Sequence, residues 1–165
     1  MIKSSFRHRF PMLAALLARP VTEDIPGEQP DDTTPLFRGS VQLRHIDAGS
    51  CNGCEVEIAQ AFAPHGDLLR FGVRLVASPR HADGVLVTGV VTKNMAAPLL
   101  KTLDAVPRPR RVVACGDCAI DGGIFAAAYG VAGPVGALTP VDTEIPGCPP
   151  APSTIIAALR GLSGR

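Results

Sequence analysis

From residue 40 onward, the hydrophobic positions of this chain alternate between short apolar runs and longer amphipathic segments. The apolar runs at 41–46, 73–76, 84–88 and 111–114 are bounded by turn residues and predict strands, and a last strand is predicted near 137–141. The segments at 54–63, 93–106 and 153–162 predict helices, with Pro98 inside or opening the second. Short apolar strands that alternate with helices indicate an α/β domain with a largely parallel sheet.

The first 39 residues follow a different pattern. A basic stretch leads into the apolar run Met12–Ala18, and the acidic, Pro-rich EDIPGEQPDDTTP follows. The apolar run is at the lower limit for a signal peptide and ends in Arg-Pro. We therefore predict an amphipathic segment and linker over 1–39, which lies against a partner or membrane surface or else is a frayed terminus, and an α/β domain over 40–165.

Composition narrows the class of protein. The chain has 165 residues, a net charge of +1 and only 4% aromatic residues, so we expect one domain that does not bind nucleic acid. Hydrophobic residues make up 46% and charged residues 19%, which suits a chain that buries part of its surface against other subunits. No apolar run reaches the roughly 18 residues that span a bilayer, so no transmembrane segment is expected.

The five cysteines follow predicted strands. Cys51 and Cys54 come after the first strand, Cys115 and Cys118 after a later one, and Cys148 after the last. In a parallel sheet these positions meet at the edge where the strands end, and ligands bind there. An odd number of cysteines without a convincing secretion signal makes disulfides a poor expectation, so metal or redox chemistry is favoured.

Three kinds of site are consistent with this spacing. Two CxxC pairs, Cys51/Cys54 and Cys115/Cys118, would make a zinc site, although they are separated by about 60 residues. The set Cys51, Cys54, Cys118 and Cys148 would suit a 4Fe–4S cluster, with Cys148-Pro149 matching the Cys-Pro of ferredoxin motifs. A CxxC dithiol enzyme needs fewer cysteines than these. Cys115, which continues the apolar run VVAC, is expected in the core.

The motifs CNGCEVEI, GDCAIDGGIF and PGCPP, in this order, resemble the iron–sulfur small subunit of membrane-bound nickel–iron hydrogenases. Within that family the chain is most similar to the formate-hydrogenlyase and energy-converting type, which is homologous to the 20 kDa subunit of complex I. The resemblance covers about residues 41–162. It implies a flavodoxin-like, doubly wound fold with cluster ligands on loops at the carboxyl ends of the strands.

The resemblance also implies a site and a role. The ligands of one proximal 4Fe–4S cluster would be Cys51, Cys54, Cys118 and Cys148, while Cys115 falls on a position that is not a family ligand. The chain would be a non-catalytic subunit that relays electrons between a nickel–iron large subunit and ferredoxin-like subunits. The complex would lie at the cytoplasmic face of the membrane, with membrane subunits of its own. A complex-I-like enzyme without nickel is the alternative, and a zinc-stabilised binding module is a further one.

Two acidic residues and one histidine near the cysteines need separate interpretation. Glu57 resembles an acidic residue that lies near the cluster in this family, so it has either a proton-linked role or a simple helix-dipole role. Glu55 is expected only to complement the helix dipole. His45 falls in a strand pattern and is expected to be a hydrogen-bonded structural residue.

Overall fold

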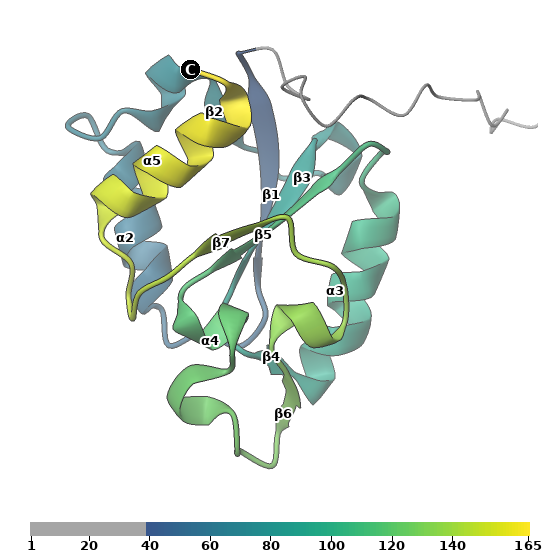
Figure 1. Cartoon of the computed structure of the whole chain (residues 1–165). Helices are drawn as coiled ribbons and strands as arrows, with labels where there is room; N and C mark the ends of the chain where they lie inside the picture. The colour runs from purple at the N-terminus through teal and green to yellow at the C-terminus, as the bar shows by residue number, and fades with distance from the viewer. Residues whose placement is uncertain (1–38) are drawn as a thin grey trace, which may run out of the picture. The chain divides into compact units, whose positions relative to one another are not determined.

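A five-stranded parallel sheet forms the centre of the protein in the computed structural model, which describes residues 39–165 (Figure 1). Its strands are β1 (Val41–Asp47), β2 (Val73–Leu75), β3 (Gly84–Thr88), β5 (Arg111–Cys115) and β7 (Thr143–Ile145). They lie in the order β2-β1-β3-β5-β7, and every neighbouring pair is parallel. This is the flavodoxin-like, doubly wound order, which confirms the predicted fold class.

Helices cover both faces of the sheet. Figure 1 shows α2 (Gly53–Phe62) and α5 (Pro152–Ser163) on one side and α3 (Lys93–Ala105) on the other. The short α4 (Asp117–Ile120) follows β5 and contributes Ala119 to the core on the α3 side. Four 3₁₀ turns complete the connections: Leu68–Phe71, Pro79–His81, Gly123–Phe125 and Val135–Ala137.

Alternation along β1 distributes its side chains between the two cores. Val41 and Leu43 pack with α2 and α5, whereas Ile46 packs with α3. All five residues of the central β3 are buried, because helices cover both of its faces. Thr88, the last residue of β3, is therefore a fully buried hydroxyl at the carboxyl end of the sheet.

A second, two-stranded antiparallel sheet joins β4 (Val91–Thr92) to β6 (Val131–Gly133). Figure 1 shows it close to α4, at the end of the main sheet where the parallel strands terminate. This pair of strands is not predicted from the hydrophobic pattern. Each of its strands has only two or three residues, which is too short for an alternating pattern to be recognised.

The last strand was predicted in the wrong place. The segment near 137–141 is not a strand, and β7 forms instead at Thr143–Ile145. A 3₁₀ turn ends at Ala137, and Leu138 and Val141 of that segment pack from irregular backbone against the core that contains Val135. The helix predicted over 93–106 is confirmed as α3, with Pro98 inside it.

The predicted amphipathic segment and linker over 1–39 lie almost entirely outside the described residues, so the domain boundary stays a prediction. In the part of the chain that the structure describes, no helix has the length and apolar character needed to cross a membrane.

Candidate metal centre

Four of the five cysteines line one small cavity of about 40 Å³ at the carboxyl edge of the sheet. Cys51 lies in the loop after β1, Cys54 in the first turn of α2, Cys118 in α4 after β5, and Cys148 in the loop after β7. Cys54 and Cys118 are buried, while Cys51 and Cys148 are exposed. The structure thus brings together residues that lie almost a hundred positions apart in the sequence.

The fifth cysteine lies elsewhere. Cys115 ends β5, is fully buried in the core beneath α2 and α5, and does not line the cavity. Its thiol is hydrogen-bonded to Cys54, and this bond, followed by burial, raises the pKa of Cys115 far above its ordinary value. This is the placement expected of a core cysteine. A zinc site made of Cys51, Cys54, Cys115 and Cys118 would need Cys115 to leave the core.

Two glycines hold the backbone close to cavity sulfurs. A Cβ at Gly116 would lie 2.6 Å from Cys54 Sγ, and a Cβ at Gly123 would lie 3.1 Å from Cys118 Sγ. Both glycines have positive φ angles, +90° and +48°, and residues with side chains rarely adopt this backbone conformation. The loops after β5 therefore bring the main chain against the sulfurs, where backbone N–H groups tune iron–sulfur centres.

The electrostatics of the cavity favour a bound positive charge. Burial raises the pKa of Cys118, and negative charges on Cys148, Cys51 and Cys54 raise it further, because four thiolates would repel one another here. The hydrogen bond with Cys115 lowers the pKa of Cys54 although burial acts against it. Iron or another cation among the sulfurs would offset this repulsion.

The donor set fits an iron–sulfur cluster. Such clusters are held by four thiolates, and four thiols surround this cavity. Within residues 39–165, no three or more Cys, His, Asp and Glu side chains are grouped as the ligands of a single metal ion.

Carboxylates hold the loops that carry two of the cysteines. Asp117 Oδ1 accepts a hydrogen bond from Gly147 N at 2.6 Å, next to Cys148. Asp47 Oδ1 accepts from Gly49 N at 2.9 Å and from Ser50 N at 2.7 Å, next to Cys51. Burial would raise the pKa of Asp47, but these backbone hydrogen bonds, together with the Ser50 hydroxyl and the charge of His45, outweigh burial and lower it. Neither aspartate is predicted from the sequence, because an Asp in a turn has no distinctive spacing.

The two glutamates of α2 have different surroundings. Glu55 lies in the first turn of α2, as expected, but its side chain is only 17% exposed and contacts Thr88 and His45. His45 is hydrogen-bonded, as predicted for a structural histidine. Glu57 is half-buried and does not line the cavity. Its proton-linked role stays a prediction, which unchanged proton-linked activity of Glu57→Gln in the assembled complex would contradict.

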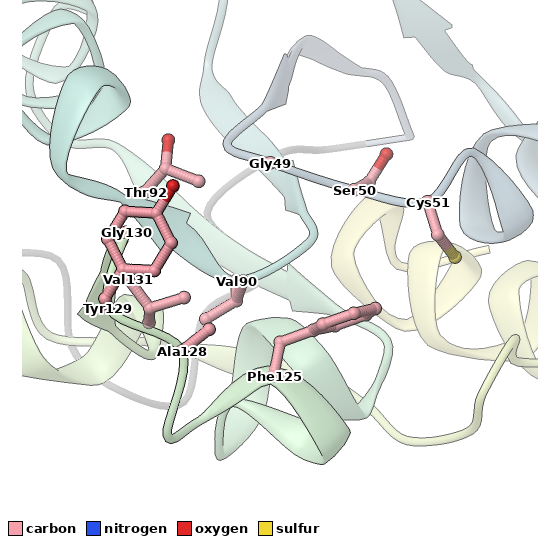
Figure 2. A pocket seen from close by; sticks show the side chains of 10 residues that line it. All are labelled: Gly49, Ser50, Cys51, Val90, Thr92, Phe125, Ala128, Tyr129, Gly130 and Val131. Atoms are coloured by element: carbon pink, nitrogen blue, oxygen red, sulfur yellow. The ribbon is translucent and has the colours of Figure 1, made fainter.

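A wider, open depression of about 430 Å³ adjoins the cysteine cavity at Cys51. Figure 2 shows Cys51 on one side of it and the ring of Tyr129 on the other, with Phe125 between them. Tyr129 is 95% exposed and the nearby Ile124 is 85% exposed. This surface is not predicted from the sequence, because the pattern around an apolar residue in a loop does not show whether that residue is buried.

The fold and the four converging cysteines define an α/β protein with a candidate metal centre at the carboxyl edge of its sheet. The chain belongs to the family described as "NADH ubiquinone oxidoreductase, 20 Kd subunit", whose pattern matches residues 51–162. This membership confirms the resemblance inferred from the motifs.

Individual relatives support this membership. The chain is 44% identical over 120 residues to formate hydrogenlyase subunit 7 of Escherichia coli, a match that covers 73% of this chain and 47% of the relative. It is 44% identical to the probable membrane-bound hydrogenase subunit mbhJ of Pyrococcus furiosus, covering 68% of this chain and 67% of that one. The chain thus spans about half the length of the first of these relatives.

Among solved structures, a chain of the membrane-bound sulfane sulfur reductase, an archaeal respiratory membrane complex, superimposes with a TM-score of 0.67. It is 32% identical in sequence, and the match covers 77% of this chain and 70% of that one. The relatives are subunits of oxidoreductase complexes, so this chain belongs to a family of oxidoreductase subunits.

Proposed function

We propose that this chain is an electron-transfer subunit that holds one 4Fe–4S cluster on Cys51, Cys54, Cys118 and Cys148. The observation that carries this proposal is the convergence of these four thiols on one cavity, with Cys115 outside it. A cluster bound there supplies a one-electron carrier. The chain's own residues supply the four sulfurs, a buried side at Cys54 and Cys118, and an exposed side at Cys51 and Cys148.

The exposed side of the cavity suits electron transfer to another subunit. Cys51 and Cys148 place the site at the surface, so an electron need not cross the core to leave it. The depression beside Cys51 and the exposed Ile124 and Tyr129 give this surface an apolar character that suits burial against a large subunit. We infer that this partner is of the nickel–iron type and that ferredoxin-like subunits exchange electrons with the same site.

We infer that the complex is a hydrogenase attached peripherally to the cytoplasmic face of the membrane through membrane subunits. The relatives with 44% identity include a formate hydrogenlyase subunit and a probable membrane-bound hydrogenase subunit, which supports this inference. In the same proposal, the segment over 1–39 contacts a partner or the membrane surface.

A complex-I-like oxidoreductase without nickel is the second candidate. The family match, which is named after the 20 kDa subunit of NADH ubiquinone oxidoreductase, favours it. The sequence of the large subunit separates the two candidates, since a hydrogenase large subunit needs its own paired CxxC nickel ligands.

Metal analysis tests the cluster. The full-length chain is purified anaerobically, and its iron, acid-labile sulfide and zinc are measured. We expect a brown protein with about four iron and four sulfide atoms per chain, as for one 4Fe–4S cluster. A colourless protein with one zinc and no sulfide would contradict both electron-transfer candidates and support the zinc-stabilised module.

A further inference from the structure

Three polar side chains form a partly buried group, and two of them are sequence neighbours of residues that line the cysteine cavity, Cys54 and Gly89. Thr88 Oγ1, at the end of β3, contacts Glu55 Oε1 of α2 and lies 2.9 Å from His45 Nε2 of β1. The distance from His45 Nε2 to Glu55 Oε1 is 3.7 Å. We call these three residues the Glu55 network. Their side chains come from three elements and meet beneath the first turn of α2, the turn that carries Cys54.

The hydrogen bonds of the network have one consistent assignment. The Thr88 hydroxyl has a single proton, and a carboxylate is its strongest nearby acceptor, so Thr88 donates to Glu55 rather than to Ile46 O at 3.5 Å. Thr88 Oγ1 is then free to accept, and His45 Nε2–H donates to it. This assignment places the imidazole proton of neutral His45 on Nε2. Thr88 thus links the carboxylate to the imidazole.

The network holds a carboxylate where water reaches it poorly. The Glu55 side chain is 17% exposed, and its second oxygen, Oε2, is buried without a hydrogen-bond partner among the described residues. Leaving a buried acceptor unpaired costs free energy. A charge with little solvent around it acts strongly on neighbouring groups. The residue before Glu55 in the sequence is Cys54, which lines the cavity, and the charge of Glu55 acts on its thiol by raising its pKa.

We propose that Glu55 sets the reduction potential of the centre held by Cys54, and that Thr88 and His45 are the residues that position its carboxylate. This inference rests on the proposed function. Reduction adds one electron to the centre. A fixed negative charge beside the centre makes the uptake of that electron less favourable. Glu55 therefore keeps the potential low. The group serves as a fixed charge and takes no part in electron transfer itself.

The test is a potentiometric titration of the whole complex, monitored by electron paramagnetic resonance. The signal to follow is the one that disappears in Cys118→Ser; if no signal disappears, the proposed function itself fails. Glu55→Gln keeps the shape and removes the charge, so we expect electron affinity to rise about tenfold, or about 59 mV for one electron. Asp104→Asn removes a carboxylate that is 83% exposed on α3, across the sheet, and is expected to change nothing.

Two variants of Thr88 test the positioning. Thr88→Val removes the hydroxyl at nearly constant shape, which frees the carboxylate to turn toward solvent, so the potential rises in the same direction as for Glu55→Gln. Thr88→Ser retains the hydroxyl and is expected to keep the wild-type potential. A cluster signal whose potential is the same in wild type, Glu55→Gln and Thr88→Val would overturn the inference and leave the proposed function intact. If Glu55→Gln does not assemble, the reduction potentials of Thr88→Val and Thr88→Ser test the inference instead. Equal potentials in these two variants would overturn it.

Discussion

Gly116 faces the sulfur of Cys54 so closely that a Cβ at this glycine would lie 2.6 Å from Cys54 Sγ. The φ angle of Gly116 is +90°, so a side chain here would be strained even without the contact. We predict that Gly116→Ala lowers the iron content of the purified chain severely, because either Cys54 or the loop after β5 must move. Bound iron and sulfide per chain measure the effect.

The matched control is Gly136→Ala. Gly136 is exposed, and a Cβ there would meet no atom within 4 Å. This variant is expected to keep full iron content. Equal iron in both variants would show that the cavity tolerates a displaced loop, and that the close approach at Gly116 is not needed for cluster binding.

The fifth cysteine gives a second prediction. Cys118 lines the cavity, whereas Cys115 is buried in the core and lies outside it. Cys115→Ser is expected to retain the cluster, with stability reduced by about 1–3 kcal/mol because a hydroxyl replaces an apolar thiol in the core. Cys118→Ser is expected to lose the cluster. Iron content and the visible absorption of the full-length chain report both; the reverse result would overturn the ligand assignment.

The features that could be predicted from sequence are those with strong local patterns. The fully buried β3 is a continuous apolar run, and GVLVT was recognised as a strand for that reason. The edge strand β7 is Thr-Glu-Ile, with only Ile145 buried, so the more apolar segment near 137–141 was chosen wrongly. Edge strands are covered on fewer sides, and their sequences show weaker hydrophobic patterns.

The convergence of the cysteines was predictable because strand ends of a parallel sheet share one edge. The contacts of the Glu55 side chain with Thr88 and His45 were not predictable. Side chains two positions apart on a helix point about 200° apart, so Glu55 and Glu57 cannot have the same surroundings. Which of them meets Thr88 depends on how α2 is rotated against the sheet. No local pattern in CNGCEVEI fixes that rotation.

The exposed apolar surface beside Cys51 leads to a third prediction. Tyr129 is 95% exposed at the edge of the depression, and aromatic residues buried at interfaces contribute strongly to binding. Tyr129→Ser is expected to weaken co-purification with the proposed large subunit, with a dissociation constant raised about tenfold or more. Leu100→Ser, at another exposed apolar residue on α3, is the control and is expected to leave assembly unchanged. Equal losses in both variants would indicate non-specific loss of solubility, and no loss would remove Tyr129 from the interface.

The fourth prediction concerns pH. Burial lowers the pKa of His45 below its ordinary 6.5, and the positive charge of Arg44 lowers it further. The negative charges of Glu55 and Asp47 raise this pKa, but burial outweighs them. In the unfolded chain His45 recovers its ordinary pKa, so below about pH 6.5 the unfolded state binds more protons than the folded state. The contribution of His45 to the free energy of unfolding is therefore fully present above pH 6.5 and is lost as the pH falls toward the lower, folded-state pKa. Urea denaturation of the full-length chain at pH 7.5, 6.5 and 5.5 measures this loss.

Two histidine variants separate this contribution from the rest of the protein. His45→Gln cannot take up the proton, so its free energy of unfolding should fall less than that of the wild type between pH 6.5 and 5.5. His81→Gln, at an exposed histidine, should keep the wild-type pH dependence. If the free energy of unfolding fell equally in His45→Gln and wild type, protonation of His45 would not oppose folding. The folded protein would then accommodate the charged imidazole as well as the neutral one.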